Sequence, residues 1–258
     1  MHARIQYLAM DKALKQRFLD QWQKYFPGAE LPITLYYTDQ PSDAPAASGT
    51  EHCIISRLKD VRHGRPSVYS AETPGCLGGK RFTGFSAKQR PNFEYFLSCG
   101  IAGKLEGERY KKSPDLVKAW LAEHRPLIAP GRYLVFKRWD MLSPEENPSV
   151  AIFFATPDVI AGLFTLANYD LATPHGVIAP MGSGCSAVVA YPLEEATGQQ
   201  RCVLGMFDVS ARPSVEAGVL TFAVPIQRLK TMVDNMDESF LITESWKDVR
   251  DRIERGSN

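Results

Sequence analysis

The stretch SVAIFFATPDVIAGLFTLANYD, Ser149 to Asp170, decides the fold class, because an apolar strand is followed there directly by a helix. SVAIFFA is a short apolar run, which is typical of a strand. Thr156 and Pro157 come next, and these residue types favour the N-cap and the first position of a helix. We therefore expect a strand and a helix to adjoin at this point of the chain.

Segments of both kinds continue on either side of this stretch. The pattern predicts strands at 31–38, 67–71, 132–139, 203–209 and 218–224 and helices at 9–25, 52–64, 91–100 and 113–124. It also predicts a Pro/Ala/Ser-rich loop at 40–50 and a closing helical segment that ends at 256. These elements lack the regular rhythm of βαβ units. The sequence therefore predicts a single α+β domain over residues 1–258, with one mixed sheet, flanking helices, glycine-rich site loops and an N-terminal helical extension at 1–30.

Composition and charge narrow the classes of function. The chain has 30 Lys and Arg against 29 Asp and Glu, a balance that provides no field to gather nucleic acid or an anionic membrane surface. The first residues mix charges into their apolar positions, unlike a signal peptide, and no apolar run approaches the roughly 18 residues that span a bilayer. We expect a soluble, cytoplasmic protein that binds no nucleic acid and no membrane.

Three of the five cysteines lie directly beside glycine. They are Cys76 in PGCLGG, Cys99 in LSCGIAG and Cys185 in GSGCSA. Bare glycine backbone lets N–H groups approach a thiolate and stabilise its charge, which favours a metal–sulfur site. Cys185 also precedes a helical segment, whose dipole is expected to lower the pKa of the thiol. For any single cysteine a buried, inert thiol is the simpler interpretation, and the chain has no CxxC pair of the zinc-ribbon or ferredoxin type.

The remaining motifs leave several interpretations open. Cys53 fits the buried face of a helix as well as a site, and Cys202 lies in the apolar strand RCVLGMF. GSG and GGKR are suited to a phosphate or to ordinary turns, since neither matches a P-loop or a dinucleotide-binding motif. Cys99 with a distant histidine is a possible nucleophilic pair, but no spacing selects the histidine. An ion pair of Asp208 with Arg212 would explain both residues without a function.

Four motifs, in this order, resemble a known family. CLGGKRFTGF, FLSCGIAGKLEGERYKKSPDLV, GSGCSAVVAYPLEE and GMFDVSAR are similar to the uncharacterised prokaryotic family catalogued as domain of unknown function 169, which includes many anaerobic bacteria and archaea. The resemblance extends from about Leu31 to the C-terminal helix. It implies that Cys53, Cys76, Cys99 and Cys185 are the family-like cysteines, while Cys202 stands where relatives have an apolar residue or part of a CxxC pair.

The resemblance implies a function as well as a ligand set. Four thiolates match the ligand count of a 4Fe-4S cluster, so the leading hypothesis is an iron–sulfur protein that transfers electrons to a partner protein or reduces a small substrate as an oxidoreductase. The alternatives are a glycine-lined module that binds an anionic metabolite or nucleotide without redox chemistry, and a structural zinc protein. Residue type alone suggests which side chains form the pocket: Gly78, Gly79, Lys80, Arg81, Glu108, Arg109, Tyr110, Asp208 and Arg212.

Overall fold

A seven-stranded mixed sheet forms the centre of the protein, in the strand order β2-β3-β1-β4-β7-β6-β5. The structure is a computed structural model that describes residues 12–40, 53–124 and 126–256. Neighbouring strands are antiparallel except for the parallel pair β5–β6. The strands are β1 (Ile33–Thr38), β2 (Ser67–Tyr69), β3 (Tyr133–Arg138), β4 (Val150–Ala155), β5 (Val177–Ile178), β6 (Cys202–Gly205) and β7 (Leu220–Pro225). The predicted α+β class is confirmed.

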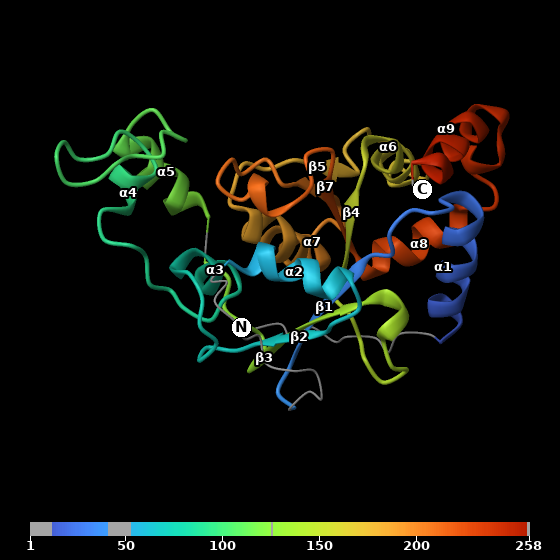
Figure 1. Cartoon of the computed structure of the whole chain (residues 1–258), viewed down its shortest axis with the longest axis horizontal. Coiled ribbons are helices and arrows are strands. Elements are labelled where there is room, and N and C mark those ends of the chain that lie inside the picture. The colour runs from blue at the N-terminus through green and yellow to red at the C-terminus, as the bar shows by residue number, and fades with distance from the viewer. Residues whose placement is uncertain (1–11, 41–52, 125, 257–258) are drawn as a thin grey trace.

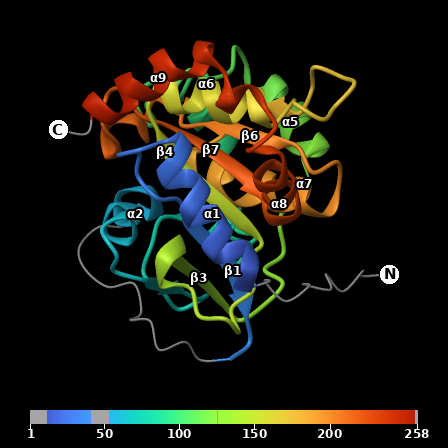
Figure 2. The same ribbon diagram turned by 90° about the vertical axis from the view of Figure 1, so that its right-hand side faces the viewer.

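Helices cover both faces of this sheet (Figures 1 and 2). They are α1 (Lys12–Tyr25), α2 (Ile54–Arg62), α3 (Leu77–Phe82), α4 (Phe93–Phe96), α5 (Pro114–Glu123), α6 (Pro157–Leu166), α7 (Tyr191–Thr197), α8 (Ile226–Asn235) and α9 (Glu244–Arg255). A π-helical segment, Ser186–Ala190, leads into α7. No helix in the described part of the chain is long and apolar enough to cross a membrane.

Strand β4 shows why the sheet needs cover on both faces. All six of its residues are buried, and alternate side chains point to opposite faces. Ala151 and Phe153 pack into one core cluster, and Ile152 and Phe154 pack into the other. The apolar run that decided the fold class is therefore a central strand with helices on each side.

One face of the sheet is fully covered, and we call it the closed face. It carries α1, α6, α8 and α9, whose apolar side chains form one continuous core with the strands. Phe18 and Trp22 of α1 are 0% and 3% exposed, and their rings stack at 5.5 Å between centroids. The helix predicted as an N-terminal extension thus contributes large aromatic residues to this core.

The opposite face, which we call the open face, has less cover. It carries α2, the π-helical segment and α7, with Ile55, Leu58 and Val188 buried against the strands. The elements between β2 and β3 do not complete this layer, because α4 and α5 pack on each other at one end of the molecule (Figure 1). The space between that end and the open face holds the main pocket.

Most predicted elements are present, with differences at three places. The loop predicted around Cys76 contains the short helix α3, and the helix predicted at 91–100 is reduced to the single turn of α4. The strand predicted at 203–209 ends at Gly205, so the following residues form a loop. The start of the helix predicted at 9–25 and nearly all of the loop at 40–50 lie outside the described residues.

Candidate functional site

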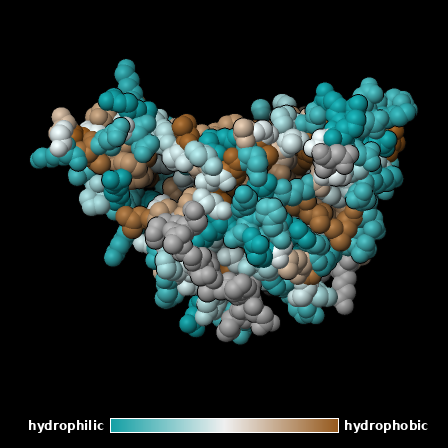
Figure 3. All heavy atoms as spheres, in the orientation of Figure 1, coloured by the Kyte–Doolittle hydropathy of each residue, from teal (hydrophilic) through white to brown (hydrophobic). Residues whose placement is uncertain are grey.

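The main pocket is a cavity of about 880 Å³ beside the open face. Five segments line it: the start of α2, α3, the region from Lys88 to Trp120, the loop before the π-helical segment, and the loop after β6. Figure 3 shows a hollow between the α4–α5 end and the main body, with hydrophobic and hydrophilic residues around it. Segments that are distant in the sequence therefore enclose a space large enough for a ligand.

The walls of this pocket are mainly apolar and aromatic. They include the side chains of Leu77, Phe82, Phe93, Phe96, Trp120, Met181 and Phe207. Met181 and Phe207 are 51% and 55% exposed, which is unusual for large apolar side chains unless they border a binding surface. An apolar ligand body would remove this surface from water.

Charged side chains lie among the apolar ones, and cations outnumber carboxylates. The lining contains four cationic residues, Arg81, Lys88, Arg90 and Lys111, and two carboxylates, Glu108 and Asp208. Burial lowers the pKa of Arg81. A guanidinium that is removed from water gains more from an anionic partner than one at the open surface.

Helix α3 begins at Cys76, and its two glycines have different surroundings. The Sγ atom of Cys76 accepts a hydrogen bond from the backbone N–H of Gly79 at 3.1 Å, so the thiol caps the helix. A Cβ atom on Gly79 would lie 3.2 Å from Ile54 and 3.3 Å from the Cys76 sulfur, whereas one on Gly78 would meet nothing within 4 Å. Gly79 therefore permits a close approach to α2, and Gly78 borders the pocket.

Cys185 lines the same pocket, at the start of the π-helical segment. Asp208 fixes this loop, since its Oδ2 accepts a hydrogen bond of 2.9 Å from the N–H of Gly184. Burial raises the pKa of Cys185 well above its usual range, and negative charge on Cys53, Cys76 and Asp208 raises it further. The lowered pKa predicted from the helix dipole is wrong, because the thiol is 6% exposed and its charged neighbours are anionic.

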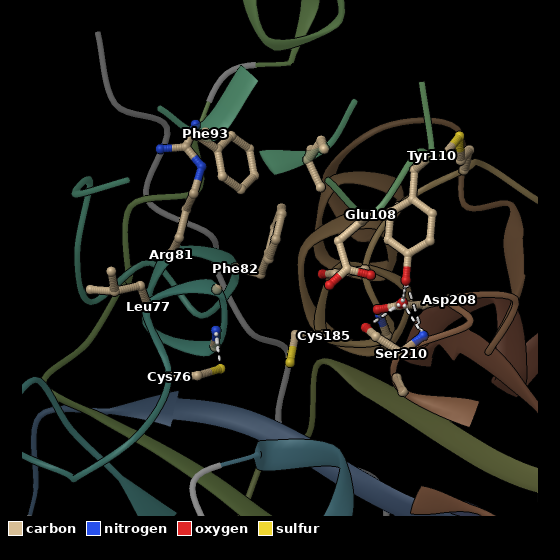
Figure 4. A pocket seen from close by; sticks show the side chains of 18 of the residues that line it. Cys76, Leu77, Arg81, Phe82, Phe93, Glu108, Tyr110, Cys185, Asp208 and Ser210 are labelled. Atoms are coloured by element: carbon tan, nitrogen blue, oxygen red, sulfur yellow. Dashed lines mark hydrogen bonds between the residues drawn. The ribbon is translucent and has the colours of Figure 1, made fainter. Parts of the chain in front are cut away.

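Three cysteines share the pocket, and two do not. Cys53, Cys76 and Cys185 line it together, and Figure 4 shows Cys76 and Cys185 near one another below Phe82. Cys99 borders a separate depression formed by residues 99–109. Cys202 is fully buried in the core of the closed face, as the sequence predicted.

The separation of Cys99 has a local cause. Gly100 has a φ of +75°, and its N–H donates to the carbonyl of Tyr95 at 2.8 Å, which turns the chain just after α4. The Cys99 side chain is exposed, and its Sγ lies 3.5 Å from the carbonyl oxygen of Gly100. The four family-like cysteines are therefore not brought together. Over residues 12–40, 53–124 and 126–256, no three His, Cys, Asp or Glu side chains converge closely enough to hold a single metal ion.

Six of the nine predicted pocket residues line this cavity, namely Gly78, Gly79, Arg81, Glu108, Tyr110 and Asp208. The other three have different roles. Lys80 donates to the carbonyl of Ala71, and Arg109 borders the Cys99 depression. Arg212 donates to the carbonyls of Glu216, Ala217 and Val219, so it holds its own loop together and does not form the ion pair considered with Asp208.

A small polar cluster forms one side of the pocket (Figure 4). Ser210 donates from its N–H to Oδ1 of Asp208 at 3.0 Å and to the hydroxyl of Tyr110 at 3.1 Å. Burial raises the pKa of Tyr110, and the neighbouring carboxylates of Asp208 and Glu108 raise it further. Tyr110 therefore stays a neutral phenol, and it links the α4–α5 end to the loop after β6.

Sequence reasoning missed most of the apolar wall and three of its cations. The missed residues are Phe82, Phe93, Phe96, Trp120, Met181, Phe207, Lys88, Arg90 and Lys111. Phe207 and Val209 flank Asp208, and in the structure these apolar side chains are 55% and 69% exposed. Had this segment been predicted as a loop, two apolar residues beside a carboxylate would have indicated a binding surface. Their prediction as strand residues concealed it.

Comparison with known proteins gives one match. A family model with the description "DUF169: Uncharacterised ArCR" matches residues 29–235, which include all the segments that line the pocket. No curated protein and no solved structure matches the chain.

Proposed function

The chain belongs to the DUF169 family, and we propose that its main pocket binds a small molecule with an apolar, largely aromatic body and an anionic group. One observation carries the proposal: a cavity of about 880 Å³ whose lining is mostly apolar, with four cationic residues against two carboxylates. Ligand pockets of proteins commonly measure about 300–1,000 Å³ and combine apolar walls with a few polar groups that orient the ligand. This pocket is at the large end of that range.

The cations favour an anionic ligand over a neutral one. Arg90 stacks over Phe96, with its guanidinium carbon 4.2 Å from the ring centroid, so aromatic surface and positive charge are presented together. Arg81 is half-buried, and its only hydrogen bond within the described residues is to the carbonyl of Ala87. An anionic group beside Arg81 would receive an N–H donor that is already partly removed from water.

Fluorescent probes test this proposal directly. We expect 8-anilinonaphthalene-1-sulfonate, an anionic aromatic amphiphile, to bind one site per chain with increased fluorescence. The uncharged analogue N-phenyl-1-naphthylamine has the same ring system without the sulfonate, and it should bind about 10-fold more weakly if one charge-assisted hydrogen bond is lost. Equal binding of both probes would contradict the anionic preference, and no saturable binding of either would contradict the pocket.

A matched pair of variants assigns the binding to the cavity. Gly78→Phe places a ring in the open space beside α3, since a Cβ at Gly78 meets nothing within 4 Å. Gly218→Phe makes the same change at an exposed glycine outside the pocket, where a Cβ also meets nothing within 4 Å. Probe binding should be lost in the first variant and retained in the second.

A second candidate function is supported by the cysteines. Cys53, Cys76 and Cys185 line the same cavity, so an iron–sulfur cluster held by these three thiolates would leave one iron accessible to a small molecule in the pocket. Structural zinc needs four ligands around one point, and no three ligand-type side chains of the described residues converge in this way, which argues against the zinc alternative. A reducing compartment such as the cytoplasm would keep these thiols available as ligands.

Iron analysis of anaerobically purified protein tests the second candidate. Cys76 and Cys99 are both exposed, which makes them a matched pair for substitution. Cys76→Ser should remove most of the iron and the visible absorbance, because a hard hydroxyl replaces a soft thiolate, and Cys99→Ser should retain both. Equal iron content in the two variants would contradict the three-cysteine ligand set.

A further inference from the structure

The segment that follows α4 presents its side chains to two different cavities. The backbone N–H of Glu108 donates to the carbonyl of Phe96 at 2.7 Å. The next N–H, that of Arg109, donates to the carbonyl of Ser98 at 3.1 Å, so the segment is fixed against the end of α4. Glu108 and Tyr110 line the main pocket, whereas Arg109 between them borders the separate depression. This alternation along the backbone directs the Glu108 carboxylate into the main pocket (Figure 4).

The two carboxylates of the pocket differ in what they bind within the protein. Asp208 accepts at Oδ1 from the N–H and the hydroxyl of Ser210 at 3.0 and 2.8 Å, and at Oδ2 from the N–H of Gly184 at 2.9 Å. The Glu108 side chain has no hydrogen bond or ion pair within the described residues. Lys111 also lines the pocket, but among those residues no ion pair joins it to either carboxylate. Asp208 is thus used by the fold, whereas Glu108 is available to a ligand.

Charges of opposite sign face the cavity from opposite sides. Figure 4 places Arg81 on one side of the Phe82 ring, and Glu108 and Asp208 on the other. Arg81 donates to the carbonyl of Ala87, and no ion pair joins it to a carboxylate in the described part of the chain. An aromatic wall therefore separates a positive end of the pocket from a negative end, and neither end neutralises the other.

We propose that the ligand of the main pocket is amphoteric, with an anionic group that binds at Arg81 and an ammonium group that binds at Glu108, on opposite ends of an aromatic body. This inference rests on the ligand pocket proposed above and specifies the class of its ligand. A ligand with only an anionic group would remove water from Glu108 without replacing its hydrogen bonds, which is unfavourable. An ammonium group at that end forms a charge-assisted hydrogen bond instead, and Asp208 beside it adds further negative charge.

Two matched compounds test the ammonium group. 5-(Aminomethyl)naphthalene-1-sulfonate and 5-methylnaphthalene-1-sulfonate share the ring and the sulfonate, and they differ by one ammonium group on the opposite side of the ring. The affinity of each is measured by displacement of bound 8-anilinonaphthalene-1-sulfonate from the full chain. We expect the ammonium compound to bind about 10-fold more tightly, as one additional charge-assisted hydrogen bond would give.

Two matched variants assign this preference to one carboxylate. Glu108→Gln keeps the shape and removes the charge, and Glu106→Gln makes the same change at an exposed residue that borders the separate depression. The preference should be lost in Glu108→Gln, which should still bind the methyl compound, and it should persist in Glu106→Gln. Equal affinity of the two compounds for the wild type, or a preference that survives in Glu108→Gln, would overturn this inference and leave the anion-binding pocket in place. If neither compound displaces the probe, or the probe itself does not bind, the proposed pocket and this inference are overturned together.

Discussion

The two faces of the sheet are covered to different extents, and the difference locates the site. On the closed face, α1, α6, α8 and α9 bury a continuous aromatic and aliphatic core in which even Cys202 is inaccessible. On the open face, α2 and the π-helical segment leave a cavity at their edge, and α3 and the α4–α5 end form its outer wall. Close packing excludes ligands, so the proposed ligand site lies where a helix layer is incomplete.

The same contrast appears in single residues. Glycine at position 162 is needed because two helices meet there, whereas Gly78 has empty space beside it. Arg62 donates to two carboxylates, whereas Arg57 donates to the carbonyl of Pro74 and faces the ring of Tyr69. Substitutions in such pairs should reduce the free energy of unfolding strongly where packing is complete. Beside the pocket they should change it little or increase it.

The largest expected effect is that of a single methyl group on α6. A Cβ at Gly162 would lie 2.4 Å from Trp246 and 2.7 Å from Phe26, both buried, so Gly162→Ala should reduce the free energy of unfolding by about 3 kcal/mol. Gly78→Ala should instead raise it by about 0.5 kcal/mol, because it restricts the unfolded chain and fits a helix. Urea unfolding of both variants measures the difference, and similar losses in both would contradict the contrast between the faces.

The next largest effect on the free energy of unfolding is expected at the two buried arginines of α2, measured in metal-free protein. Arg62→Met should reduce the free energy of unfolding by about 2 kcal/mol, since it leaves Glu30 and Glu216 without their partner. Arg57→Met should cost less, because within the described residues this guanidinium meets a carbonyl and an aromatic ring and no carboxylate. Thermal unfolding of both variants decides this, and an equal loss for Arg57→Met would contradict the difference between the two arginines.

The smallest expected effect concerns two cysteines in metal-free protein. Cys202→Ser should reduce the free energy of unfolding by about 1.5 kcal/mol, because it places a hydroxyl in the core of the closed face. Cys76→Ser should change it very little, since this side chain is exposed and a serine can still cap α3. Unfolding in guanidinium chloride compares the stability of the two variants. A larger loss of stability in Cys76→Ser than in Cys202→Ser would contradict the difference between the two faces.

Much of the fold could be predicted because the core elements follow simple periodicities. The strand and helix at Ser149–Asp170 occur as β4 and α6, with Thr156 at the N-cap and Pro157 in the first turn. Helix α3 was missed because Gly78 and Gly79 are poor helix formers, and only the capping thiol and the packing on α2 reveal why a helix forms there. Local propensity was overridden at that point by tertiary contacts.

The site was only partly predictable, for a related reason. Glycine beside cysteine directed attention to Cys76 and Cys185, whose loops meet at the pocket. The same pattern grouped Cys99 with these two cysteines, but the turn at Gly100 directs the Cys99 loop into a separate depression.

The most direct measurement of the central claim is the alkylation of two exposed cysteines with and without a bound ligand. Cys76 lines the main pocket and Cys99 borders the separate depression, so the two thiols report on different regions of one chain. Metal-free protein is treated with iodoacetamide in the absence and presence of saturating 8-anilinonaphthalene-1-sulfonate, and modification of each residue is followed by mass spectrometry. We expect the probe to slow the alkylation of Cys76 and to leave that of Cys99 unchanged. Saturable binding that protects Cys99 alone, or protects neither thiol, would contradict the assignment of the ligand site to the open face.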